Sequence, residues 1–497
     1  MSSTLIISVI VAYFLLLIVI SYITGKSDSN DSFFLGDKQS PWYLVAFGML
    51  GATLSGITFI SVPGKVATSA FSYMQLTMGF FVGYLIIALV LIPLYYRMNL
   101  TSIYGYLKER FGTSSYKTGA SFFLLSRVMG ASLRLYIVAN VLQMAIFDDW
   151  GVPYIVTVLI TILLIWVYTF RSGIKTIIWT DTLQTLFMLL AVGTSIYLIS
   201  DELNLGFTSL ITTISESEYS QVFFWEGKQH FFKQFFSGVF IAIVMTGLDQ
   251  DMMQKNLSCR TKEDAQKNLY WFSGALVIVN LIFLSLGALL YIYANEKGIT
   301  ATKDDLFPVI ALNGGLGVGV GLIFILGLIA AAYSSADSAL TSLTTSFCVD
   351  ILDFKKVKDQ KKQIKTRKWI HLMFSFILVG VIMIIKALND DSVIDALFQL
   401  AGYTYGPLLG LYAFGLLTKH KIKDKWVPLV AILSPLICLL ITNSLWLYCE
   451  LEYYFGFYYS QSVYDLCYNF SNIGFELLIL NGFITFVGLY LLKTNKQ

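Results

Sequence analysis

Hydroxyl and carboxylate side chains interrupt one of the most apolar stretches of this 497-residue chain, residues 327 to 343, which read GLIAAAYSSADSALTSL. A helix turns by 100° per residue, so four small or hydroxyl-bearing positions fall on one stripe: Ala331, Ser334, Ser335 and Ser338. Asp337 lies at the edge of this stripe. A dehydrated cation needs several oxygens, and hydroxyls beside freed backbone carbonyls supply them. Small and hydroxyl side chains also serve ordinary helix packing, but Asp337 favours an ion.

A second stretch, residues 42 to 65, combines glycines with hydroxyls in the sequence WYLVAFGMLGATLSGITFISVPGK. Glycine weakens a helix because it costs more backbone entropy than other residues. The glycines are Gly48, Gly51 and Gly56, and the hydroxyls belong to Thr53, Ser55 and Thr58. Close helix packing is the alternative use of glycine. The combination predicts an unwound segment that could form a binding site.

Three ionisable side chains lie deep within apolar segments: Asp181, Arg127 and Arg134. Charges inside a membrane are costly and suggest function. Asp181 could be a cation ligand, a proton carrier or half of a buried ion pair. The two arginines, spaced i, i+7, are candidate partners for that pair, or one of them clamps a substrate carboxylate. The sequence leaves these roles open. Asp249 is expected to cap the cytoplasmic end of its span.

These residues need a membrane scaffold, and the composition predicts one. Hydrophobic residues make up 56% of the chain and charged residues only 13%, which is typical of an all-α integral membrane protein. A window of about 20 apolar residues gives about 13 transmembrane helices. The apolar segment 307 to 349 is too long for one span, and Asn313-Gly314-Gly315 indicates that its first part is separate.

The distribution of basic residues supports this count. The segments expected on one side hold 26 Lys and Arg residues, and those on the other side hold four. Cytoplasmic loops carry the excess of positive charge, so the N-terminus is expected outside and the C-terminus inside. No loop is long enough for a soluble domain, and residues 1–497 are expected to form one multi-pass domain in a plasma membrane, such as a bacterial inner membrane.

Several functional classes lack support in the sequence. The five cysteines and three histidines show no ligand spacing, so no metal enzyme is expected. The net charge is only +3, and the basic residues are distributed by side of the membrane rather than gathered in one patch. This does not suggest a nucleic-acid partner. An intramembrane transferase would need a catalytic constellation near one membrane face, and none is found. The protein is therefore not expected to be an enzyme.

Four motifs resemble those of the sodium/solute symporter family, in the style of its sialic acid and monocarboxylate/iodide branches: GIKTIIWTDTLQ, TGLDQDMMQK, AAAYSSADSAL and LAGYTYGPLLGLYAFGLL. The resemblance implies the leucine-transporter-type fold, in which two five-helix repeats have inverted topology. It assigns residues 5–24 to an extra N-terminal helix, 42–200 to the first repeat, 232–417 to the second and 426–492 to two C-terminal helices.

The resemblance also implies binding residues. The shared sodium site would use Gly51, Leu54, Ala331, Ser334 and Ser335. A possible second sodium would bind at Asp181, Asp337 and Ser338. Candidate substrate contacts are Thr53, Ser55, Thr58, Gln75, Arg127 and Arg134.

The expected function is secondary active symport, in which a sodium gradient drives uptake of a small organic solute by alternating access. The motifs favour an organic anion or an acidic sugar such as sialic acid. The expected partners are this solute, the sodium ion and the lipid bilayer, with the protein monomeric or weakly oligomeric. Proton coupling and a sugar or amino-acid substrate remain alternatives, and a sensor without transport is a further one.

Overall fold

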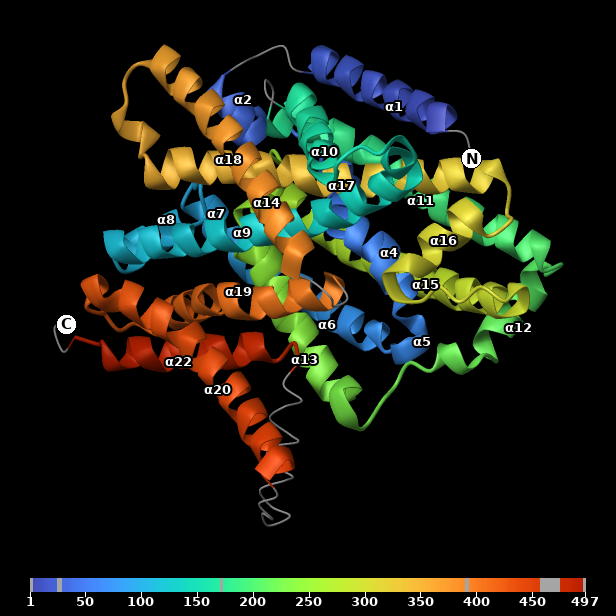
Figure 1. The fold of residues 1–497 in the computed structure, drawn as a ribbon. Coiled ribbons are helices and arrows are strands. Elements are labelled where there is room, and N and C mark those ends of the chain that lie inside the picture. The colour runs from blue at the N-terminus through green and yellow to red at the C-terminus, as the bar shows by residue number, and fades with distance from the viewer. Residues whose placement is uncertain (1–2, 25–28, 170–172, 389–392, 456–473, 495–497) are drawn as a thin grey trace.

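The computed structural model describes residues 3–24, 29–169, 173–388, 393–455 and 474–494. Within these ranges the regular structure is helical, with two isolated β-bridges and no named strand. Most of the long helices run side by side (Figure 1). In that view the N-terminus and α12 (Phe207–Ser215) lie at one end of the bundle, and the C-terminus and α8 (Gly105–Arg110) lie at the other.

The first half of the bundle contains α1 (Ser3–Thr24), α3 (Trp42–Thr53), α4 (Gly56–Gly64), α6 (Tyr73–Ile86), α7 (Ile92–Arg97), α9 (Thr113–Leu142), α10 (Tyr154–Thr169) and α11 (Ile174–Glu202). The second half contains α13 (Phe231–Ala242), α14 (Gln250–Leu257), α15 (Lys262–Lys297), α17 (Val318–Ser346), α18 (Gln360–Leu388) and α19 (Val393–Leu417), followed by α20 (Val427–Phe455) and α22 (Leu477–Leu491). Short helices connect some of these elements: α2 (Asn30–Leu35), α5 (Val66–Ser69) and α16 (Leu306–Asn313).

Eight helices among the described residues are long and apolar enough to cross a membrane, and the number reaches ten if each of two bent pairs forms one span. Large apolar side chains on the outer surface, such as Leu15, Val19 and Leu163, are 52–57% exposed. Such an apolar exterior suits lipid rather than water. The chain is therefore an integral membrane protein.

Two helices are broken inside the bundle. Between α3 and α4 the axis bends by 53° at Leu54 and Ser55. The sequence predicts this unwound segment from its glycines and hydroxyls. A second bend, of 64°, separates the α13 segment from α14, and it was not predicted. The segment before α17 forms the separate helix α16, as Asn313-Gly314-Gly315 indicates.

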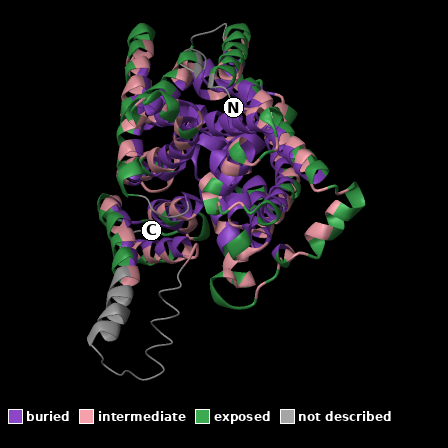
Figure 2. Cartoon of the chain, turned by 45° about the vertical axis from the view of Figure 1, so that its right-hand side comes forward, coloured by how far each residue is buried: buried purple, intermediate pink, exposed green. Residues whose placement is uncertain are grey.

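The most polar part of α17 lies in the interior. Every residue from Gly327 to Ser346 is buried, and buried positions occupy the centre of the bundle while exposed ones form its rim (Figure 2). In contrast, α1 lies at the edge of the bundle (Figure 1), and only 22% of its apolar window is buried. The hydroxyl stripe thus faces other helices, which is where hydroxyls can act as ligands.

Candidate substrate and cation site

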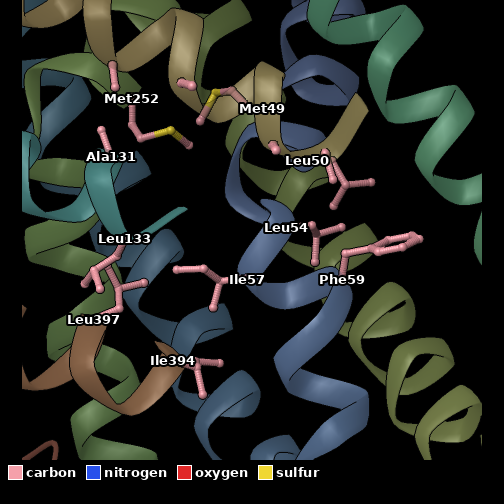
Figure 3. Close-up of a cluster of buried hydrophobic side chains, with 14 of the residues drawn as sticks. Met49, Leu50, Leu54, Ile57, Phe59, Ala131, Leu133, Met252, Ile394 and Leu397 are labelled. Carbon is pink, nitrogen blue, oxygen red and sulfur yellow. The ribbon is translucent and has the colours of Figure 1, made fainter. Parts of the chain in front are cut away.

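A cavity of about 70 Å³ lies beside the break between α3 and α4. Its lining includes residues from α4, α6, α9, α13 and α19, and both Arg127 and Arg134 contribute to it. Apolar side chains from three helices also line it, and the same side chains gather on one side of the broken helix (Figure 3): Ile57, Met252, Ile394 and Leu397. A concave, mostly apolar space with a few polar groups is the usual form of a small-molecule site.

The hydroxyl stripe of α17 meets the broken helix directly. Ser335 Oγ donates a hydrogen bond of 2.7 Å to the carbonyl oxygen of Ala52, and Ser335 is fully buried. Ala331 and Leu54 are each 1% exposed. The structure thus brings α17 against the segment where the backbone leaves its helical pattern. Freed carbonyls and a hydroxyl at one place are the oxygen ligands that a small hard cation requires.

Gly51 has a packing role at this place. A Cβ atom on Gly51 would lie 2.1 Å from Thr185 Oγ1 of α11. Thr185 Oγ1 instead lies 3.0 Å from the carbonyl oxygen of Phe47, to which it donates, so that the backbones of α3 and α11 approach closely. Gly51 therefore allows the contact that holds the broken helix in position.

Asp181 forms a buried ion pair, but its partner is not an arginine. Lys255 Nζ lies 2.7 Å from Asp181 Oδ2, with the side chains 1% and 0% exposed. Ser334 Oγ donates to Asp181 Oδ1 at 2.7 Å. The expectation that Arg127 or Arg134 pairs with Asp181 is therefore wrong. We refer to Asp181, Lys255 and Ser334 as the Asp181 cluster.

Two further residues of α17, Ser338 and Asp337, lie next to this cluster. Ser338 Oγ donates to the carbonyl oxygen of Ser334 at 3.0 Å. The carboxylate of Asp337 accepts from the backbone N–H of Ser338 at 2.5 Å, and both residues are at most 1% exposed. The structure brings Ser334 and Ser338 to Asp181 from one face of α17, while Asp337 is turned by one helical position.

Arg127 forms ion pairs with both carboxylates at the start of α14. Its guanidinium contacts Asp251, and Nη1 lies 3.9 Å from Asp249 Oδ2. Tyr405 of α19 donates its hydroxyl to Asp249. All four residues, here named the α14 cluster, are buried. Three helices, α9, α14 and α19, thus meet through one ionic network.

Asp249 caps a helix, but the expected place is wrong, because it caps the start of the next helix, α14, and not the end of its own span. Its Oδ1 accepts from the N–H groups of Asp251 at 2.9 Å and Met252 at 3.4 Å, and it thereby caps the N-terminus of α14. The residue is fully buried rather than at the end of a span. A carboxylate at a helix N-terminus satisfies backbone donors and interacts favourably with the helix dipole.

Arg134 lies two helical turns after Arg127 on α9 and has a different environment. Its Nε and Nη1 find no hydrogen-bond partner among the described residues, although the residue is only 6% exposed. Arg134 lines both the main cavity and a smaller one of about 10 Å³ beside Tyr405. A buried guanidinium with unsatisfied donors is costly, so a ligand with an anionic group would be bound favourably here.

The candidate substrate residues divide into two groups. Thr53, Ser55 and Thr58 line the cavity with the arginines, and Thr53 Oγ1 has no partner among the described residues. Gln75 is not part of the cavity lining. Its amide donates to the carbonyl oxygen of Gln229 at 2.9 Å and accepts from the N–H of Phe224, so it anchors the 221–230 segment to α6.

Sequence reasoning missed α14. The polar sequence of residues 251–268 predicts a cytoplasmic loop, with Lys255 among its basic residues. In the structure all eight residues of α14 are buried. The available signal was helical spacing: the polar residues Asp251, Gln254 and Lys255 recur at i, i+3 and i+4. They lie next to the apolar Met252 and Met253.

Comparison with known proteins decides the family. A sequence model of the sodium:solute symporter family matches residues 33–420, which is most of the chain. The chain belongs to the sodium:solute symporter family. Its activity is thus sodium-coupled solute symport, and its transported partners are a solute and the sodium ion. This is a family of transporters rather than of enzymes.

Relatives of known function give this family assignment more detail. The chain is 26% identical to the sodium/sialic acid symporter NanT of Aliivibrio fischeri, with 80% of each chain covered. It is 25% identical to the sodium/sialic acid symporter SiaT of Proteus mirabilis, with 82% of this chain and 83% of the relative covered. The rabbit (Oryctolagus cuniculus) sodium-dependent multivitamin transporter is 27% identical over 77% of this chain and 61% of its own length.

Two solved transporter structures share the fold. A substrate-bound, outward-open Na⁺-coupled sialic acid symporter superposes with a TM-score of 0.79 at 18% identity, covering 98% of this chain and 97% of the other. Mhp1, a nucleobase-cation-symport-1 family transporter, gives a TM-score of 0.51 at 14% identity, covering 94% and 95%. The expected leucine-transporter type of fold is therefore confirmed in its overall form.

Proposed function

We propose that this symporter takes up a small carboxylate-bearing solute, and that an acidic sugar such as sialic acid is the first candidate. The observation that carries the proposal is Arg134. Its guanidinium is buried against the cavity with donors left over, and a positively charged group with free N–H donors can bind a carboxylate. Two of the relatives are named sodium/sialic acid symporters, which supports this substrate class.

The two arginines then have separate roles. Arg127 is already neutralised by Asp249 and Asp251, so it has little charge to offer a solute. Arg134 lies two helical turns further along α9 and keeps its charge for the cavity. Thr53, Ser55 and Thr58 provide hydroxyls in the same cavity, which suits a polyhydroxylated acid.

The proposed cation site lies between Ser335, the carbonyl of Ala52, and the backbone of Gly51, Leu54 and Ala331. The 2.7 Å bond from Ser335 to Ala52 supports this site, because an ion there would be held by oxygens from both helices. A sodium ion that ties α17 to the broken helix would favour one arrangement of the solute cavity. Binding of the ion and of the solute would then be cooperative.

The proposed topology has thirteen spans, with the N-terminus outside and the C-terminus inside, in a plasma membrane such as a bacterial inner membrane. The two bent helices support an assignment of residues 42–200 and 232–417 as inverted repeats, because each repeat would begin with a broken helix. With the expected orientation, the α14 cluster would lie on the cytoplasmic side of the cavity. A membrane potential would contribute about 2.3 kcal/mol per charge per 100 mV to uptake.

The α14 cluster would close the cytoplasmic side in this conformation. Arg127 and Tyr405 join α9 and α19 to α14 through buried ionic contacts. Release of solute to the cytoplasm would require these contacts to separate. On the opposite side, Lys65 of the α4 end lies 2.6 Å from Asp395 of α19, and both side chains are partly exposed. These pairs are the proposed inner and outer gates of alternating access.

Uptake into proteoliposomes tests the proposal. The purified protein is reconstituted and supplied with labelled sialic acid, a monocarboxylate, a neutral sugar and proline, with a sodium gradient, a proton gradient or neither. Sodium-driven uptake of an acidic solute is expected. Arg134→Gln should abolish uptake of the acid, whereas Arg97→Gln, the same change at an exposed position, should not. Uptake that follows the proton gradient alone, or is unaffected in Arg134→Gln, would contradict the proposal.

A further inference from the structure

A lysine at the Asp181 cluster occupies the place where the sequence predicts a second cation. Lys255 Nζ lies 2.7 Å from Asp181 Oδ2, and Ser334 Oγ lies 2.7 Å from Asp181 Oδ1. Both oxygens of the carboxylate therefore have a donor. The Lys255 side chain is 1% exposed and that of Asp181 is 0% exposed, so neither charge is in contact with water.

We propose that the Lys255 ammonium and a sodium ion compete for Asp181, so that Lys255 is a built-in cation that fills this position until sodium displaces it. This inference rests on the sodium-coupled symport proposed above and concerns the regulation of its second ion site. An ammonium and a sodium ion carry the same charge, and both are bound by carboxylate and hydroxyl oxygens.

The charges of the cluster support competition over joint binding. Asp181 and Lys255 together are neutral. A sodium ion bound to the same carboxylate would lie next to the ammonium, and two cations that close together repel each other strongly in a site closed to solvent. Asp181 without either cation would be equally unfavourable. The carboxylate therefore favours one monovalent cation at a time.

The position of Lys255 links this exchange to the proposed inner gate. Lys255 lies on α14, which follows the 64° bend. The same helix carries Asp251, which pairs with Arg127. When sodium takes Asp181, Lys255 is released and α14 loses one of its two buried ionic anchors. Binding of the ion thus weakens the attachment of the element that must move for cytoplasmic release.

The experiment measures sodium binding without transport. The thermal unfolding midpoint of the purified full-length protein is recorded against sodium concentration, with choline chloride holding the ionic strength. Lys255→Met should lower the half-saturating sodium concentration roughly tenfold or more, because the competing charge is gone. The double variant Lys255→Met with Asp181→Asn should lose this gain. Lys297→Met, at an exposed lysine that pairs with Glu202, is the matched control and should match the wild type.

A second variant covers the case in which Lys255→Met does not fold at low sodium. Lys255→Arg keeps the ion pair and adds a two-pronged contact to the carboxylate, so it should fold and should raise the half-saturating sodium concentration. An unchanged or weaker sodium affinity in Lys255→Met, or no change in Lys255→Arg, overturns the competition. The first result would indicate that both cations bind together, with Asp337 as the second carboxylate.

The outcomes separate this inference from the proposed function. If the competition is wrong, the wild type still responds to sodium and residue 255 does not alter the response. If sodium coupling itself is wrong, the wild type shows no sodium-dependent stabilisation and no sodium-driven uptake. The second result would overturn both proposals.

Discussion

The two arginines of α9 allow a paired prediction in which the same substitution has opposite effects on stability. Arg127 contacts Asp251 and lies 3.9 Å from Asp249, all of them at most 5% exposed at the side chain. Arg127→Gln would leave two carboxylates buried without their cation, and breaking a buried ion pair in this way costs about 3–5 kcal/mol. We expect a marked loss of stability.

Arg134→Gln should instead stabilise the solute-free protein. Nε and Nη1 of Arg134 lack partners among the described residues, and an unsatisfied buried donor costs about 1–3 kcal/mol, with more for a charged group. Glutamine removes the charge and leaves a shorter polar group at the cavity. The two variants should therefore differ by about 4 kcal/mol or more in the free energy of unfolding.

The assay is the thermal unfolding midpoint of both variants and the wild type in the same detergent and salt, with and without the acidic solute. Without solute, Arg127→Gln should unfold below the wild type and Arg134→Gln above it. Added solute should stabilise the wild type and leave Arg134→Gln unchanged. Destabilisation of both variants to a similar extent would refute the separation of roles, because it would mean that Arg134 is also a structural ion-pair residue.

Three further predictions concern other parts of the structure. Ser335→Ala should raise the sodium concentration for half-maximal uptake roughly fivefold to tenfold, because the proposed site loses one oxygen ligand worth about 1 kcal/mol; an unchanged sodium dependence of uptake would contradict the site. Gly51→Ala should lower the unfolding midpoint, because its Cβ would lie 2.1 Å from Thr185 Oγ1, and adding Thr185→Ala should restore most of the loss of about 1–3 kcal/mol. Burial raises the pKa of the Asp304 carboxyl in the loop between α15 and α16, so the folded protein keeps this proton to a higher pH than the unfolded chain does. Stability should therefore fall as the pH rises from the ordinary Asp value of about 4 through that raised pKa, and thermal melts of Asp304→Asn across this window should show a flatter profile than the wild type.

The sequence predicted those parts of the site that depend on local pattern. The hydroxyls of Ser334 and Ser335 stand out because polar groups are rare in apolar spans, and the structure buries both of them against other helices. The break at Leu54 and Ser55 follows from glycine, whose weak helical preference acts locally. The same reasoning identified Asp181 as a buried charge.

The pairing of charges could not be predicted in this way. Whether Asp181 meets Arg127, Arg134 or Lys255 depends on how helices pack, and no residue spacing encodes it. The sequence places Lys255 in a loop instead of a buried helix. A hydropathy window reports only the mean hydropathy of α14, and its polar side chains make that mean resemble the value for a loop. A helix whose polar groups are satisfied by other helices can be buried whatever its mean hydropathy.

The shortness of α14 has a consequence for how tightly the transporter couples its cargoes. Residues 251 and 255 lie one turn apart on an eight-residue helix, which is too short to flex in its middle. The helix therefore cannot move away from Arg127 while the Lys255 ammonium stays on Asp181. Slippage, in which solute crosses without sodium, would need α14 to leave Arg127 while Lys255 still holds Asp181, and a rigid eight-residue helix works against it.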